Sequence, residues 1–159
     1  MTTATTSAAT PSAATSRRTG LSGILAARWP TALAIAASTA SLALTSPLPE
    51  RLQTQISAWG VLTAAVIYLA WGTARGELGE RRWLTAQTAA VLGFAAVAIA
   101  AAAADPAIAR YVLAAGWLTH AAWDVAHHHA DRVVPRWYAE LCMVCDLILA
   151  AALLTVGTL

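Results

Sequence analysis

The stretch that decides the fold is WLTAQTAAVLGFAAVAIAAAAA, residues 83–104, in which no side chain is charged. A helix that crosses the hydrocarbon core of a bilayer needs about 20 predominantly apolar residues. This stretch is long enough, and it therefore predicts a transmembrane helix. Asp105 and Pro106 follow directly. Because proline suits the first turn of a helix, a second helix is expected to begin there.

Further apolar runs lie on both sides of this stretch. Together they predict an all-α bundle of five transmembrane helices, at about 29–46, 56–74, 83–104, 107–129 and 137–157. Residues 23–159 are expected to form this single transmembrane domain. Residues 1–22 are rich in Thr, Ala and Ser without an apolar period, which predicts a disordered cytoplasmic tail.

The composition excludes several classes of protein. Hydrophobic residues make up 58% of the 159 residues and charged residues only 11%, whereas a soluble domain carries about 25% charged residues. A disordered chain, a nucleic-acid-binding protein and an ordinary soluble enzyme are therefore not expected. The bilayer is the expected partner, and the two cysteines are too few for a disulfide framework.

Arginine placement predicts the orientation, because cytoplasmic loops carry an excess of positive charge. Eight arginines fall in the tail and in two alternate loops, and only Arg51 and Arg110 fall on the other side. This predicts a cytoplasmic N-terminus, an outer C-terminus and a location in the bacterial inner membrane. If the first apolar run is instead a cleaved signal peptide, four helices remain in the same orientation.

A cluster of ionisable residues marks the candidate site. His120, Asp124 and His127 share a stripe about 60° wide on one helix. The short loop to the next helix brings Asp146 level with His120. Ionisable groups inside a membrane cost about 2.5–3.5 kcal/mol each on insertion scales, so they are retained when they pair, conduct or catalyse. These four residues are the predicted catalytic groups.

One hypothesis for the cluster is acid/base chemistry on a lipid or isoprenoid substrate. A carboxylate beside histidine sets its tautomer and prepares it for proton transfer. The side chains expected to line the substrate pocket are Trp117, Trp123, Tyr138 and Cys142.

A second hypothesis is a divalent metal, zinc or iron, because histidine nitrogen and carboxylate oxygen suit both. The expected ligands are His120, Asp124 and His128, and Asp146 is able to complete the set. His120 and His127 lie about 10.5 Å apart along the axis, too far for one ion.

Two further hypotheses remain, a proton or metal carrier and a structural or accessory subunit without catalysis. Against a carrier, only the fourth and fifth predicted helices are expected to hold polar residues, and the pattern shows no inverted repeat. A homo-oligomer would supply the missing symmetry. In the structural hypothesis, a buried His–Asp pair simply joins two helices.

The last third of the chain resembles a pattern in small, uncharacterised bacterial multi-pass membrane proteins. The residues that carry it are His120-x-x-Trp123-Asp124-x-x-His127-His128, then Val134-Pro135-x-Trp137-Tyr138, Cys142 and Asp146. The resemblance implies no particular activity. Membrane desaturases carry several histidine boxes on separate segments, whereas the four histidines here form one cluster, so a di-iron desaturase is not expected.

Overall fold

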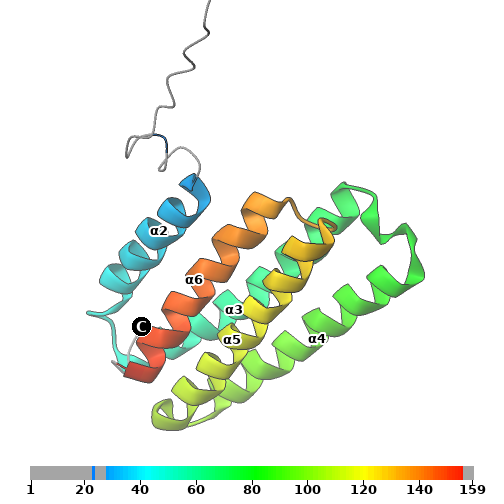
Figure 1. Ribbon diagram of the computed structural model, residues 1–159. Coiled ribbons are helices and arrows are strands. Elements are labelled where there is room, and N and C mark those ends of the chain that lie inside the picture. Colours follow the sequence, from blue (N-terminus) through cyan, green and yellow to red (C-terminus); the bar gives the residue numbers. More distant parts are fainter. Residues whose placement is uncertain (1–22, 24–27, 156–159) are drawn as a thin grey trace, which may run out of the picture.

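The computed structural model describes residue 23 and residues 28–155 of the chain. This part contains five long helices and no β-strand (Figure 1). They are α2 (Trp29–Thr45), α3 (Glu50–Ala74), α4 (Arg81–Ala103), α5 (Pro106–Ala130) and α6 (Arg136–Thr155), with a 3-10 turn, η1 (Glu77–Gly79), before α4. The prediction of an all-α bundle is confirmed. The predicted tail, residues 1–22, lies outside the described residues.

Proline and acidic residues set where the helices begin. The Asp105 carboxylate accepts a hydrogen bond from the Ala107 backbone N–H at 3.0 Å, and Pro106 follows it as the first residue of α5. α3 begins at Glu50, earlier than the predicted residue 56. Pro49 forms its N-cap, and the carboxylate of Glu50 is favourable beside the positive end of the helix dipole. The apolar run therefore marks only the later part of this helix.

α5 occupies the centre of the bundle. It contacts α3, α4 and α6, while α2 packs against the far side of α6 (Figure 1). The main hydrophobic core joins α3, α4, α5 and α6 through buried side chains such as Val61, Phe94, Leu113, Trp117 and Leu153. A side chain on the inner face of α5 is therefore surrounded by protein.

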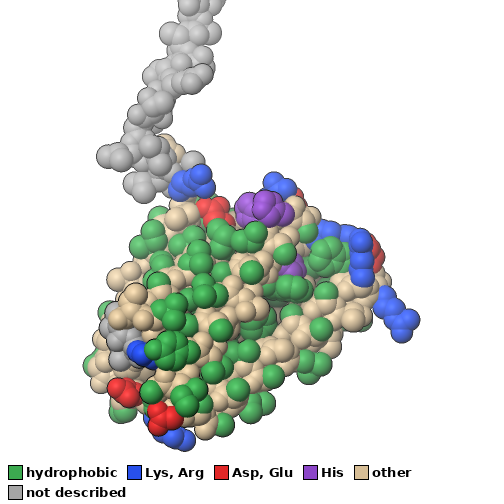
Figure 2. Space-filling model, turned by 60° about the horizontal axis from the view of Figure 1, so that its bottom comes forward, with side chains coloured by type: hydrophobic (Ala, Val, Ile, Leu, Met, Phe, Trp, Pro, Cys, Tyr) green, Lys and Arg blue, Asp and Glu red, His purple; other side chains and the backbone are tan. Residues whose placement is uncertain are grey.

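Three helices, α3, α4 and α6, are long and apolar enough to cross a membrane. α2 is apolar but has only 17 residues, and the histidines make α5 more polar. Large apolar side chains face outwards, among them Leu44, Leu92 and Ile99 with 74%, 66% and 67% of their surface exposed. Figure 2 shows charged side chains gathered at opposite ends of the visible face, with an apolar band between them. These features indicate a membrane protein.

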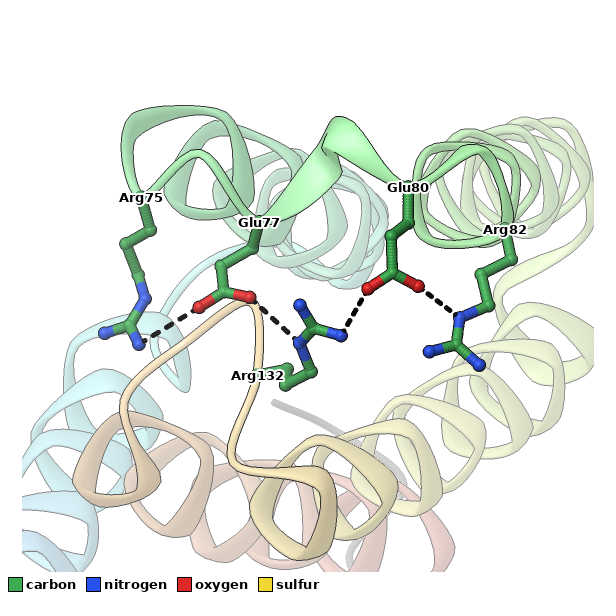
Figure 3. Close-up of polar contacts among 5 residues, drawn as sticks. All are labelled: Arg75, Glu77, Glu80, Arg82 and Arg132. Carbon is green, nitrogen blue, oxygen red and sulfur yellow. Dashed lines mark hydrogen bonds and ion pairs between the residues drawn. The ribbon is translucent and has the colours of Figure 1, made fainter.

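A chain of ion pairs closes one end of the bundle (Figure 3). Arg132, between α5 and α6, donates to Glu77 at 3.0 Å and to Glu80 at 2.8 Å. Arg75 and Arg82 extend this chain on either side. The hydrogen bond from Arg132 lowers the pKa of the Glu80 carboxyl below its ordinary value. We call this the Arg-rich end, where the loop between α3 and α4 is tied to the loop between α5 and α6.

Candidate metal centre

His120 and two aspartates form a buried group between α5 and α6. His120 Nδ1 lies 2.7 Å from Asp146 Oδ2 and 3.4 Å from Asp124 Oδ1. All three side chains are buried, and their potential ligand atoms lie within 4.8 Å of one another. The predicted match in depth between His120 and Asp146 is therefore seen in the structure. It follows from the short α5–α6 connection, which sets the register of the two helices.

Tyr68 of α3 completes the group from a third helix. Its hydroxyl donates a hydrogen bond of 2.5 Å to Asp124 Oδ1. Its ring stands edge-on to two imidazoles, with centroid distances of 5.4 Å to His120 and 5.0 Å to His127. Tyr68 therefore fixes the Asp124 carboxylate and separates the two histidines.

Two polar atoms of the group lack a hydrogen-bond partner among the described residues. They are His120 Nε2 and Asp124 Oδ2, and both are buried. Most buried polar atoms in proteins are hydrogen-bonded, so each exception calls for an explanation such as an ion or a water molecule. His120 Nε2 and Asp124 Oδ2 are therefore available to a further ligand such as an ion or a water molecule.

His127 belongs to a separate arrangement nearer the Arg-rich end. Its Nδ1 lies 2.8 Å from the Trp123 carbonyl, and its Nε2 lies 2.7 Å from the Gln87 amide nitrogen. A carbonyl only accepts, so Nδ1 carries the proton and Nε2 accepts from Gln87. Both ring nitrogens are thus engaged within the protein, which suits a residue that positions the helices around the centre.

The group differs in part from the predicted ligand set. His120 and Asp124 come together as expected, but the third member is Asp146, and His128 is not one of the three. His128 is only partly buried near the end of α5. The hydroxyl of Tyr68 and the amide of Gln87 were not foreseen.

The expectation that only the fourth and fifth predicted helices hold polar residues is wrong. Tyr68 and Ser57 on α3 and Gln87 on α4 are buried polar side chains as well. Each reaches α5, where Ser57 accepts a hydrogen bond of 2.9 Å from Trp117 Nε1. Helix periodicity in the sequence predicts which face of a helix points inwards. It does not predict which residues of the other helices that face contacts. One argument against a carrier is thereby removed.

An apolar groove of about 730 Å³ lies between α4 and α5. Phe94 and Trp123 line it, and their rings lie 5.0 Å from His120 and 4.7 Å from His127, measured between centroids. Of the four residues predicted to line a substrate pocket, Trp123 does so here. Trp117 lies in the main core, and Tyr138 and Cys142 pack with Tyr68 in a second core cluster.

The second core cluster separates the buried group from the Arg-rich end. It is built on Tyr68, Val133, Val134 and Ala139, all of which are buried. Val133 has a φ of 73°, which is rare for a β-branched residue and strains the backbone. The α5–α6 loop thus places buried apolar side chains between the group and the Arg-rich end.

The donor set suits a divalent metal ion in composition and charge, and its potential ligand atoms lie within 4.8 Å of one another. In tetrahedral zinc sites with bonds of about 2.0–2.1 Å, the ligand atoms lie about 3.3 Å apart. His120 Nδ1 lies 3.4 Å from Asp124 Oδ1, close to that value, whereas its 2.7 Å separation from Asp146 Oδ2 is a hydrogen-bond distance that would have to lengthen around an ion. A neutral imidazole and two carboxylates carry two negative charges, which one divalent ion neutralises in a medium where uncompensated charge is costly.

No protein family matches the chain, and no curated protein or solved structure is similar to it. The fold and the buried group therefore define the class on their own. The chain is a helical membrane protein with a His/Asp group that could bind a metal ion.

Proposed function

We propose that this protein is a membrane metalloprotein that holds one divalent ion, zinc or iron, on His120, Asp124 and Asp146. The observation that carries the proposal is the clustering of their ligand atoms within 4.8 Å in a buried position. Tyr68, through its bond to Asp124, orients a ligand from outside the coordination sphere. Such partners raise metal affinity and fix ligand geometry.

The activity we propose is metal-assisted or acid/base chemistry on a hydrophobic substrate. Three protein ligands leave a fourth position free, which is the pattern of catalytic zinc sites. A metal in that setting polarises a carbonyl or activates a water molecule. His127 positions α4 against α5 through Gln87.

For the membrane arrangement, we infer that all five helices span the bacterial inner membrane with a cytoplasmic N-terminus. The support is the arginine count, because Arg75, Arg82 and Arg132 gather at one end of the bundle while Arg51 and Arg110 belong to the helix starts at the other. The Arg-rich end then faces the cytoplasm.

The metal proposal is tested on protein purified in mild detergent and supplemented with zinc or iron. Elemental analysis is expected to give about one ion per chain, since the three ligands form a single centre. Asp146→Asn, which keeps the shape of the side chain, and His120→Ala are expected to lose most of it. His129→Ala is the matched control, because His129 lies on the same helix and is exposed.

Two outcomes contradict the metal proposal. One is a folded parent protein that binds neither ion after supplementation. The other is equal metal loss in His129→Ala and Asp146→Asn. Helical circular dichroism of every variant separates loss of metal from loss of fold.

A metal-free acid/base enzyme is the second candidate, and the 2.7 Å contact between His120 Nδ1 and Asp146 Oδ2 favours it. That hydrogen bond orients the imidazole, as a carboxylate does for a catalytic histidine. If no metal binds, the measurement that decides for this candidate is the His120 side-chain nitrogen spectrum. In that case Asp146→Asn is expected to change the tautomer of the His120 imidazole.

A further inference from the structure

We propose that the start of α4, at the Arg-rich end, binds the phosphate group of an anionic phospholipid. Arg81 is its main contact, and Arg82 and Arg132 lie beside it. None of these residues belongs to the buried group of His and Asp, so this surface site does not depend on the proposed metal centre.

The Arg-rich end carries more positive than negative charge. Among the described residues it holds six arginines and four acidic residues, namely Arg28, Arg75, Arg81, Arg82, Arg132 and Arg136 with Glu77, Glu80, Asp131 and Glu140. The opposite end is balanced, with Arg51 and Arg110 against Glu50 and Asp105. The surplus positive charge of the described helices and loops is therefore confined to the Arg-rich end.

Every carboxylate at this end is already engaged. In the chain of ion pairs in Figure 3, three arginines share two carboxylates, those of Glu77 and Glu80. Asp131 and Glu140 each pair with one further arginine. Within the described part of the chain, Arg81 forms no ion pair and no side-chain hydrogen bond. Its charge is therefore available to a partner outside the protein.

Arg81 lies where a lipid headgroup is expected. It is exposed and is the first residue of α4, which is long and apolar enough to cross a membrane. The outward-facing Leu92 and Ile99 follow 11 and 18 residues later, within about 20° of Arg81 around the helix. At about 1.5 Å per residue this apolar stripe extends about 27 Å from Arg81, close to the hydrocarbon thickness of about 30 Å. Arg81 thus marks the polar end of a lipid-facing stripe.

Two further guanidinium groups lie beside the start of α4. Those of Arg82 and Arg132 each lie 5.6 Å from the centroid of the Trp83 ring. Tryptophan is enriched at the level of the headgroups, and the arginine fork matches the oxygens of a phosphate. Both arginines also contact Glu80, so they add to the positive field, whereas Arg81 supplies a full unpaired charge.

An anionic phospholipid matches both the surplus charge and the apolar stripe that ends at Arg81. A soluble anion matches the charge alone. Each basic residue near an anionic membrane surface contributes about 1 kcal/mol of attraction. In a zwitterionic lipid a cation next to the phosphate cancels this attraction, so we expect the site to prefer phosphatidylglycerol to phosphatidylcholine.

The test uses the full chain in mild detergent, titrated with phosphatidylglycerol or with phosphatidylcholine of the same acyl chains. Native mass spectrometry counts the bound lipid. Arg81→Gln is expected to weaken phosphatidylglycerol binding about fivefold, the change that corresponds to about 1 kcal/mol for one arginine. Arg51→Gln is the matched control, because Arg51 is also exposed in the first turn of an apolar helix but lies at the balanced end.

A second variant changes the affinity in the opposite direction. Glu80→Gln removes a carboxylate that Arg82 and Arg132 contact, so the positive field at the start of α4 increases. It is expected to strengthen phosphatidylglycerol binding about fivefold by the same reasoning. A variant that is merely destabilised would not bind lipid more tightly, and helical circular dichroism checks the fold of each protein.

Four outcomes overturn the headgroup site. They are equal affinity for the two lipids, equal losses in Arg81→Gln and Arg51→Gln, weaker binding in Glu80→Gln, and complete displacement of the lipid by inorganic phosphate at the same concentration. The last outcome would identify a soluble anion as the ligand. Bound metal does not enter these measurements, so failure of the proposed metal centre leaves their outcome unchanged.

Discussion

Tyr68 holds the buried group together from a helix that contributes no other member. Its hydroxyl satisfies one oxygen of Asp124, which is fully buried. The other oxygen has no partner among the described residues. Asp124 thus depends on Tyr68 for its one strong hydrogen bond besides the longer contact with His120.

Replacing Tyr68 by phenylalanine should weaken both the fold and the proposed metal centre. Loss of the donor leaves a buried acceptor unsatisfied and costs about 1–3 kcal/mol of unfolding free energy. Loss of an orienting partner lowers metal affinity by about 10–100-fold. Unfolding in mixed micelles and metal competition measure the two effects. Tyr111→Phe, at an exposed position, is expected to leave the metal affinity unchanged, and an equal loss there would contradict this role for Tyr68.

At the residue scale, the sequence predicts local relations better than distant ones. The pairing of His120 with Asp146 follows from a short loop between antiparallel helices, so residue counting finds it. Tyr68 and Gln87 are 56 and 40 residues from their partners. Their contacts depend on how α3 and α4 rotate against α5, which helix periodicity leaves open.

Among the helices, α5 carries most of the site and has an aspartate at each end. Asp105 caps its start through the Ala107 N–H. Asp131 caps its end with a φ of 52°, in the left-handed region. Asp105 therefore stabilises the start of α5. Asp131 at the end of α5 occupies a backbone conformation that suits glycine better than aspartate.

Substitutions at the two ends of α5 should have opposite effects. Asp105→Ala removes the cap and is expected to lower the unfolding free energy by about 1 kcal/mol. Asp131→Gly places glycine in the left-handed conformation, which glycine adopts without strain. It also removes the exposed ion pair with Arg136, which is worth about 0–1 kcal/mol. The net effect is expected to be a rise of about 0.5 kcal/mol in the unfolding free energy. Unfolding in mixed micelles distinguishes them. Equal destabilisation by both would show that the conformation at Asp131 costs nothing.

The helices themselves were largely predictable from the sequence. Apolar runs and prolines placed four of the five starts within about two residues of those observed, because lipid-facing helices need long apolar stretches. The exception is the start of α3, where a polar first turn precedes the apolar run. The most polar helix, α5, is also the one that packs against three others, α3, α4 and α6.

On the scale of the whole molecule, charge is divided between two ends and one buried group. The ion pairs of Arg132 tie two loops at the Arg-rich end. Asp124 and Asp146 lie within the bundle beside His120. Arginines at the ends of the bundle set the orientation in the membrane. Charged groups within the bundle are costly there and are retained only at a site where they pair or function.

Reporter fusions test the proposed orientation. A green fluorescent protein joined after Gly79 is expected to fluoresce, because that loop belongs to the Arg-rich end. Alkaline phosphatase joined after Asp105 or after Leu159 is expected to be active outside. A fluorescent fusion at Leu159 would contradict five spans.

The place of α6 has a consequence for biosynthesis. It is the last of the described helices to be synthesised, yet it supplies Asp146 to the buried group and the surface against which α2 packs. Until α6 inserts, a nascent chain leaves His120 without its shortest contact and α2 without its neighbour. Helix α2 supplies no residue to the buried group, whereas a chain that stopped before α6 would lack Asp146. The order of translation thus makes completion of the buried group coincide with insertion of the last described helix.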